Sequence, residues 1–306
     1  MKEIPSVVTV TCIRDLPLLE LQAQGVCKYL DRINPIVIVV NEADPAPWFD
    51  YFDQHIRHYY DNHDLTILTR NIDFPGPWQV FRSHESNPWS AGWQTQQVLK
   101  LVIADKLQNN SYLVLDSQNF LICPWSACYQ EEKIPYRKGH FVMPKQAYYN
   151  YARTLNLTNL PDLSKHYMSM CTPFYMHTNM VKSLIASQGG LDSFIQFFHQ
   201  ASAIRSEFML YAVWLEKHGG VENYHCITHD YGHPMLRDHR TEFDNDYKHF
   251  LFAIGARPIH AWVSVNHRSW GDMTDQQYEI LCRKLSNYNL VPKFEEYRAN
   301  YIDYKF

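Results

Sequence analysis

The stretch YLVLDSQNFL places four polar side chains directly after a short apolar run. Tyr112 to Leu115 reads as a buried strand, and the residues that follow it are Asp116, Ser117, Gln118 and Asn119. A polar turn explains this pattern, because Asp, Ser and Asn bond to nearby backbone groups where strands end. A ligand site explains it as well, because ligands of open α/β sheets bind at the carboxyl ends of the strands. This stretch alone leaves both interpretations open.

Polar residues also lie at the ends of the first two predicted strands. Thr9, Thr11, Arg14 and Asp15 lie in or just after the strand Val7 to Thr11, and Asn41 and Glu42 follow the strand Pro35 to Val40. In a parallel sheet these ends share one edge with Asp116 and Ser117, which is how a nucleotide site is assembled from separate loops. Neither Gly-x-Gly-x-x-Gly nor Gly-x-x-x-x-Gly-Lys-Ser/Thr occurs. A dinucleotide oxidoreductase and a P-loop enzyme are therefore disfavoured.

A third group of polar residues lies on a predicted helix from about Ser90 to Leu107, just before Asp116. Trp93, Gln96 or Gln97, and Lys100 are three and four residues apart, so they share one helix face. Such a face presents amides and an ammonium to a phosphate or a ribose. A solvated helix face has the same periodicity, so the spacing alone does not decide between the two.

The elements that position these residues alternate between strand-like and helix-like segments. The strands are apolar on both faces, and the helices between them predict a mostly parallel central sheet covered on both sides. The second half is less regular, with strand-like segments GHFVMP, MSMCTPFYMHT, VENYHCIT and PIHAWVSV. Its expected helices are Asn179 to Ser187, Leu191 to Ala203, one capped by Ser206 and ended by Gly219 and Gly220, and Thr274 to Asn287. We expect a single α/β domain.

Composition narrows the class of protein. The 306 residues are 46% hydrophobic and carry a formal net charge of −4, so no basic footprint for nucleic acid is apparent. The amino-terminal sequence lacks an export signal, and no run approaches the roughly 18 apolar residues of a membrane span. Seven scattered cysteines without a Cys-x-x-Cys pair favour reduced thiols. We therefore expect a cytoplasmic protein without a membrane span.

Taken in order, several motifs resemble glycosyltransferase-like proteins of bacteria and phages that have the GT-A fold. They are VTVTCIRD, IVIVVNE, GWQTQQVLKL, YLVLDSQNFL, CTPFYMHT and SEFMLYAVWL. The resemblance implies a GT-A-like domain over residues 1–306, with a nucleotide-sugar-binding half at 1–125 and an acceptor-binding half with a closing segment at 126–306. It implies transfer of a hexose or pentose from a nucleotide-sugar donor to a hydroxyl. The acceptor would be a polysaccharide or, because relatives occur in phages, a hydroxymethylated DNA base.

The resemblance also assigns roles to residues. Thr9, Thr11, Arg14, Asp15, Trp93, Gln97, Lys100 and Ser117 would bind the donor. Asp116 and Gln118 occupy the Asp-x-Asp motif that holds a divalent Mn or Mg ion on the diphosphate, and His267 would reach back to that ion, with His229 and Asp230 as a rival pair. Gln118 departs from the motif, because an amide contributes no charge to a site for a hard cation.

Three explanations of Gln118 are open. In the first, Gln118 coordinates the ion through its carbonyl together with Asp116, or helps a weakened site that a later residue completes. In the second, no ion is used, and Lys100, Arg14 and His267 neutralise the diphosphate. In the third explanation the chain is an inactive protein that still binds the nucleotide sugar.

Glu207 is the candidate carboxylate on the acceptor side. It lies in the first turn of a predicted helix, where the helix dipole favours a carboxylate without any catalytic role. The resemblance places its motif beside the acceptor, where Glu207 would orient the hydroxyl or take its proton. We expect Glu207 and Asp116 to be the catalytic residues.

The segment Phe74 to Ser90 is predicted to be a long loop rich in aromatic residues. It holds Trp78, Phe81, Arg82, His84 and Trp89, and it either covers the donor, grips the acceptor or packs its aromatic rings on the surface.

Three histidines recur at intervals of four residues. His225, His229 and His233 would form a zinc-binding face on a helix, as in a zinc hydrolase. The strand-like alternation around them and the following Gly232 and Pro234 argue against that helix, so a zinc hydrolase is a remote alternative.

Overall fold

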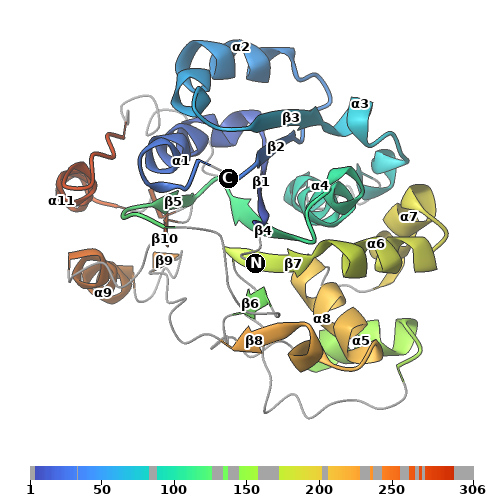
Figure 1. The fold of residues 1–306 in the computed structure, drawn as a ribbon. Coiled ribbons are helices and arrows are strands. Elements are labelled where there is room, and N and C mark those ends of the chain that lie inside the picture. Colours follow the sequence, from blue (N-terminus) through green and yellow to red (C-terminus); the bar gives the residue numbers. More distant parts are fainter. Residues whose placement is uncertain are drawn as a thin grey trace.

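The structure, a computed structural model, describes residues 4–32, 34–82, 88–125, 134–136, 145–157, 172–201, 206–227, 235–236, 243–255, 262–265, 269–270 and 273–292. Within these residues, a central sheet of five strands has the spatial order β3-β2-β1-β4-β7 (Figure 1). The strands are β1 (Ser6–Thr11), β2 (Ile36–Val40), β3 (Leu65–Thr69), β4 (Ser111–Asp116) and β7 (Phe174–His177). The first four are parallel, and β7 runs antiparallel to β4.

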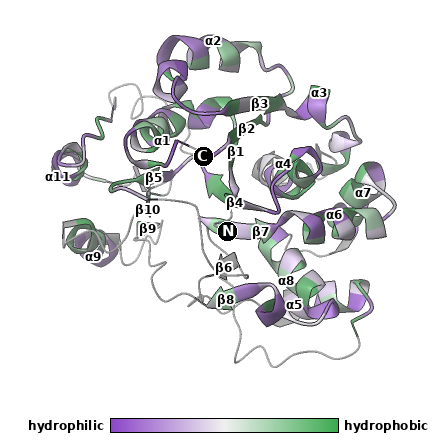
Figure 2. Ribbon diagram, in the orientation of Figure 1, coloured by the Kyte–Doolittle hydropathy of each residue, from purple (hydrophilic) through white to green (hydrophobic). Residues whose placement is uncertain are grey.

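Alternate strand residues face two hydrophobic layers, one on each side of the sheet. Ile36 and Ile38 pack with residues of helices α1 (Leu16–Tyr29) and α2 (Ala46–His55). Val37 and Val39 face the opposite layer, whose helices are α4 (Pro88–Val102), α5 (Lys145–Thr154), α6 (Thr178–Ser187), α7 (Leu191–Ala201) and α8 (Glu207–Lys217). The strands are largely hydrophobic, whereas the helices carry both colours in Figure 2. The mostly parallel sheet with helices on both faces is therefore confirmed.

A third layer adjoins the outer face of α1. In the described part of the chain it contains a small sheet, β5-β10-β9, and two helices; the elements are β5 (Asn119–Leu121), β9 (Met235–Leu236), β10 (Trp262–Val265), α9 (Phe243–Gly255) and α11 (Asp275–Ser286). Leu18 and Leu21 of α1 contribute to its core. A separate pair joins β6 (Ile134–Tyr136) to β8 (His225–Ile227). The short helices are α3 (Arg70–Asp73), η1 (Ile13–Asp15), η2 (Arg57–Tyr60), η3 (Trp78–Arg82), η4 (Ile103–Lys106) and η5 (Val221–Asn223).

Several predicted boundaries follow local signals. The Ser206 hydroxyl accepts a hydrogen bond from the Met209 N–H at the start of α8, and Gly219 and Gly220 adopt positive φ after its end. The predicted helix up to Leu107 ends earlier, because α4 gives way to η4. Within VENYHCIT only β8 is extended, since η5 precedes it.

Other elements were missed or lie outside the described residues. The missed elements include the short strands β5, β6 and β9 and the helices α5 and α9. The segment GHFVMP, part of MSMCTPFYMHT and the stretch 293–306 lie outside the described residues. The division into a donor half and an acceptor half stays a prediction. Among the described helices, none has both the length and the hydrophobicity needed to span a membrane.

Gly25 allows α1 to pack closely against β5. A Cβ at this position would lie 2.6 Å from the Leu121 carbonyl oxygen and 2.9 Å from its nitrogen. We expect Gly25→Ala to lower the free energy of unfolding by about 1–3 kcal/mol, because backbone must move to admit the methyl group.

Gly92 in α4 is the matched control, because a Cβ there meets no atom within 4 Å. Gly92→Ala should leave the free energy of unfolding unchanged or raise it by up to about 1 kcal/mol through helix propensity. Urea denaturation measures both variants, and equal effects of the two substitutions would contradict the close packing at Gly25.

Candidate active site

The carboxyl ends of β1 and β4 meet where the strand order changes direction. In the sheet, β2 and then β3 lie on one side of β1, whereas β4 lies on the other side. Val10 of β1 is in register with Asp116, the last residue of β4. Such a switch point leaves a crevice beyond the strand ends, which is where open α/β sheets bind ligands. Asp116 therefore lies at the edge that the sequence predicted.

The turn after Asp116 is held by two buried amide side chains. The Asn119 side-chain oxygen accepts a hydrogen bond from the Asp116 N–H at 2.7 Å. From α1, the Gln22 amide donates to the carbonyl oxygens of Asp116 at 2.9 Å and Asn119 at 2.7 Å. The Thr9 hydroxyl donates to the Gln22 side-chain oxygen at 2.9 Å. The polar turn that YLVLDSQNFL predicts is therefore present, and it fixes the backbone of Asp116; the ligand site stays a prediction.

The small hydroxyl residues predicted to bind the donor are buried. Thr9 is engaged with Gln22, and the Thr11 hydroxyl donates to the Cys12 carbonyl oxygen at 3.4 Å. Both side chains are thus engaged within the protein in this structure, and donor binding by Thr9 and Thr11 stays a prediction. Ser117 is also buried, inside the turn after β4.

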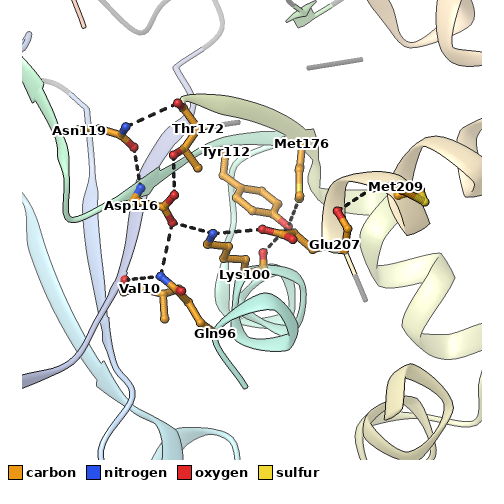
Figure 3. A network of polar contacts seen from close by, with 11 residues as sticks. Val10, Gln96, Lys100, Tyr112, Asp116, Asn119, Thr172, Met176, Glu207 and Met209 are labelled. Carbon is orange, nitrogen blue, oxygen red and sulfur yellow. Dashed lines mark hydrogen bonds and ion pairs between the residues drawn. The ribbon is translucent and has the colours of Figure 1, made fainter. Parts of the chain in front are cut away.

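Lys100 connects Asp116 to Glu207 (Figure 3). Its Nζ lies 2.7 Å from Asp116 Oδ1 and 3.0 Å from Glu207 Oε1. The exposed fractions of the side chains are 2% for Lys100, 0% for Glu207 and 25% for Asp116. With its nitrogen toward Glu207, the Gln97 amide donates to both oxygens of that carboxylate. One ammonium from α4 therefore joins the end of β4 to the first turn of α8.

The charges within this group depend on one another. Burial lowers the pKa of Lys100, but the carboxylates of Asp116 and Glu207 outweigh this effect, so its pKa is raised and the ammonium stays charged. Burial raises the pKa of Glu207 above its ordinary value, because this effect outweighs the lowering by the nearby Lys100. The group places two carboxylates around one ammonium, so removal of the ammonium would leave buried negative charge without compensation.

Besides the Lys100 ammonium, two other side chains donate hydrogen bonds to Asp116. The Thr172 hydroxyl donates to Oδ2 at 2.8 Å, and the Gln96 amide donates to Oδ1 at 3.4 Å and to the Val10 carbonyl oxygen at 3.3 Å. The predicted stripe on α4 thus extends from Trp93, which is 46% exposed, to the buried Lys100. The solvated-face explanation is wrong for Gln97 and Lys100.

The connection from β1 to α1 passes beside the same crevice. Burial raises the pKa of Asp15 to about 6, although its hydrogen bond with Cys12 lowers it. Asp116 and Glu42 add smaller repulsive contributions. Glu42 accepts a hydrogen bond from the Ile13 N–H at 2.7 Å, and Arg14 is exposed. The negative charges of Asp116 and Glu42 therefore act on Asp15, and the exposed Arg14 partly offsets them.

A cavity of about 440 Å³ lies beyond β2 and β3. It is lined by Ala43, Arg70, Asn71, Gly76, Trp78, Gln79, Phe81, Ala91, Gly92 and Thr95. The Arg70 guanidinium donates to the Asn41 side-chain oxygen at 2.9 Å, which orients it at the strand ends. Trp78 and Phe81 belong to the hydrophobic core, so the predicted loop does not pack these two rings on the surface. The side chains of Arg82, His84 and Trp89 are not among those that the structure describes.

The histidine and metal predictions have different outcomes. His225 lies on strand β8, where its Nε2 is 2.8 Å from the Tyr211 hydroxyl, so no helical zinc face begins there. His229, Asp230, His233 and His267 lie outside the described residues. Among the side chains that the structure describes, no three His, Cys, Asp or Glu residues are grouped as metal ligands. Sequence reasoning missed Gln22 and Thr172, which contact Asp116 from distant segments.

Loss of the Lys100 ammonium tests the energetic importance of this group. We expect Lys100→Met to lower the free energy of unfolding by about 3–5 kcal/mol, because it strands buried carboxylates. Arg57→Met is the matched control, since Arg57 Nε lies 2.7 Å from Asp53 Oδ1 but both side chains are about half exposed. This surface pair should contribute less than about 1 kcal/mol. Urea denaturation compares the variants, and similar small losses would contradict the importance of the buried group.

The raised pKa of Asp15 predicts a pH-dependent cost in stability. Between the unfolded and folded pKa values the folded state binds more protons, so the stability contributed by Asp15 falls as pH rises through this window. We expect Asp15→Asn to raise the free energy of unfolding by about 1–3 kcal/mol near pH 7.5, and to have no effect below about pH 4. Asp50→Asn, at an exposed site on α2, is the control. A gain that is independent of pH would contradict the assignment.

Comparisons with known proteins place this geometry in context. Among solved structures, a bifunctional glycosyltransferase, WbbM, matches with a TM-score of 0.54 and 11% identity over 97% of this chain and 51% of that chain. The glycosyltransferase GlyE of Streptococcus pneumoniae TIGR4 matches with a TM-score of 0.48 and 8% identity over 98% of this chain and 64% of that chain. The chain thus spans about half of WbbM, and the likeness shows a GT-A-like fold.

Sequence comparison adds a family. No curated protein matches the sequence. A family model, described as a family of unknown function (DUF6492), matches residues 8–253, which include β1, the Asp116 turn, α4 and α8. This match covers most of the chain, and the protein belongs to the DUF6492 family.

Proposed function

We propose that the protein is a glycosyltransferase that moves a hexose or pentose from a nucleotide sugar to a hydroxyl acceptor. The observation that carries this proposal is the position of Asp116, a partly exposed carboxylate at the end of β4 and at the switch point beside β1. The GT-A-like fold supports it by analogy. The sequence resemblance in GWQTQQVLKL and SEFMLYAVWL supports it independently, because these motifs supply Lys100 and Glu207.

The donor would lie along the carboxyl edge of the sheet. The sugar end would contact Asp116, and the diphosphate would pass the β1–α1 connection, where Arg14 is exposed. The nucleoside would reach toward the cavity that Arg70 and Trp78 line beyond β2 and β3. Adjacent strands are about 4.8 Å apart, so the distance from β4 to β3 suits an extended nucleoside diphosphate.

Glu207 would act through Lys100 in this arrangement. Its carboxylate is fully buried and bound to Lys100 and Gln97, so an acceptor hydroxyl has no access to it in this conformation. We therefore assign Glu207 as a positioning residue in place of the predicted acceptor base. Rate acceleration would then come from alignment of donor and acceptor and from fixed charges around the diphosphate.

The acceptor is proposed to be a glycan. A hydroxymethylated DNA base is the second candidate, and the net charge of −4 offers its phosphate backbone no general attraction. Exposed Trp93 at the start of α4 favours a sugar acceptor, because aromatic rings present an apolar face beside a polar edge.

A nucleotide-release assay tests the function. The full chain is incubated with UDP-, GDP- and dTDP-sugars, with glycan or hydroxymethylated DNA acceptors, and release of nucleoside diphosphate is measured. We expect turnover with one donor and a glycan, and a loss of about 100-fold or more in kcat/KM for Asp116→Asn, since one fixed polar group at a reacting centre is worth this much. Asp50→Asn, on exposed α2, is the control and should retain turnover.

Other outcomes of the same assay select the alternatives. Turnover with hydroxymethylated DNA alone would replace the glycan by DNA as the acceptor. Saturable nucleotide binding without turnover would identify an inactive nucleotide-sugar-binding protein, the alternative that Gln118 raises. Neither binding nor turnover with any donor would overturn the proposed function.

A further inference from the structure

The carboxylate of Asp116 is already occupied by donors of the protein itself. Lys100 Nζ is 2.7 Å from Oδ1, the Gln96 amide is 3.4 Å from the same oxygen, and the Thr172 hydroxyl is 2.8 Å from Oδ2. A carboxylate has about four lone-pair sites, so these donors use most of them. Figure 3 shows Gln96, Lys100 and Thr172 approaching Asp116 from different sides. A bare metal-binding carboxylate would instead keep oxygen lone pairs free toward the crevice.

The lysine is built into the core and cannot easily turn away. Its side chain is 2% exposed, and its second carboxylate partner, Glu207, is fully buried. The ammonium also lies 5.4 Å from the ring centre of Phe208. The Tyr112 hydroxyl donates to the Lys100 carbonyl oxygen at 3.0 Å, which ties this turn of α4 to β4. Withdrawal of Lys100 would therefore leave the buried Glu207 carboxylate and the partly exposed Asp116 carboxylate without this counter-charge.

The described residues do not fit a divalent cation at Asp116. The neighbouring position is Gln118, whose side-chain amide supplies no charge to a cation. Its main chain is fixed, because the main-chain carbonyl oxygen accepts the Val265 N–H at 3.3 Å. Two other described carboxylates that act electrostatically near Asp116 are engaged, since Asp15 bonds with Cys12 and Glu42 accepts the Ile13 N–H. An ion bound to Oδ1 would lie beside the Lys100 ammonium, and the two positive charges would repel each other.

We propose that Lys100 takes the place of the divalent cation, so that this site binds its ligand without a metal. Asp116, which shares the Lys100 ammonium with Glu207, then accepts one further hydrogen bond from a sugar hydroxyl at its remaining lone-pair site instead of coordinating an ion. Glu207 holds the ammonium in position. The ligand assignment rests on the proposed function, whereas the statement about metal binding concerns the chain itself.

Titration with Mn²⁺ alone tests the proposal directly. The full chain is treated with EDTA, dialysed and titrated with MnCl₂ by calorimetry, and its Tm is measured with and without the ion. We expect neither saturable heat nor a shift in Tm. Saturable binding that is lost in Asp116→Asn would overturn the proposal.

Removal of the lysine should create the missing site. In Lys100→Met the carboxylates of Asp116 and Glu207 face the space of the former ammonium, so Mn²⁺ should bind at least about tenfold more tightly than to the wild type and raise Tm. Combining Lys100→Met with Asp116→Asn should abolish this gain. Lys182→Met is the matched control, because Lys182 is a helix lysine that donates to the Leu107 carbonyl oxygen, and it should gain no Mn²⁺ binding.

The outcomes separate this proposal from the function. If Lys100→Met does not fold, the wild-type titration still decides. Turnover that occurs with Mn²⁺ and is lost in EDTA would uphold the glycosyltransferase and overturn the metal-free site. Absence of both turnover and Mn²⁺ binding would overturn the proposed function and leave the role of Lys100 intact. Turnover at full rate in EDTA supports both.

Discussion

The ammonium of Lys100 lies between carboxylates from two different parts of the molecule, the end of β4 and the first turn of α8. Charges of this kind are costly to bury singly, so the three side chains must be placed together. Their placement fixes how α4 lies across the sheet and where α8 begins. It also determines the chemistry of Asp116, because Asp116 is the partly exposed one of the two carboxylates that Lys100 contacts.

A second constraint acts on the backbone of the same residue. Two buried amides hold the turn after β4: Gln22 on α1 binds the Asp116 carbonyl oxygen, and Asn119 at the end of the turn binds the Asp116 N–H. Gly25, one turn further along α1, lets the following strand pass at close range. Asp116 is thus held through its side chain by α4 and through its main chain by α1. A site arranged in this way needs little reorganisation when a ligand arrives.

The sequence predicted elements well where local physical signals were strong. β2 is a run of five apolar residues, and α8 carries its cap at Ser206 and its terminating glycines. The edge at Asp116 followed from the same logic, since carboxyl ends of parallel strands meet. Short pieces such as β5 lack such signals, because three residues are extended only through pairing with β10.

The partners of Asp116 were beyond prediction for a related reason. Lys100 and Glu207 are 107 residues apart, and each has a sufficient local explanation, one as a helix surface residue and one as a helix-dipole partner. Gln22 reads as an ordinary polar position among leucines, and Thr172 lies 56 residues from Asp116. Only the fold brings these groups to one point, so their roles become visible only in three dimensions.

A crystal structure of the full chain with a bound nucleoside diphosphate, grown in EDTA, tests the central claim most directly. The account predicts diphosphate density in the crevice between the ends of β1 and β4, with Lys100 still in contact with Asp116 and Glu207. A nucleotide bound elsewhere, or a crevice that stays empty at saturating nucleotide while Lys100 turns away from Asp116, would contradict it.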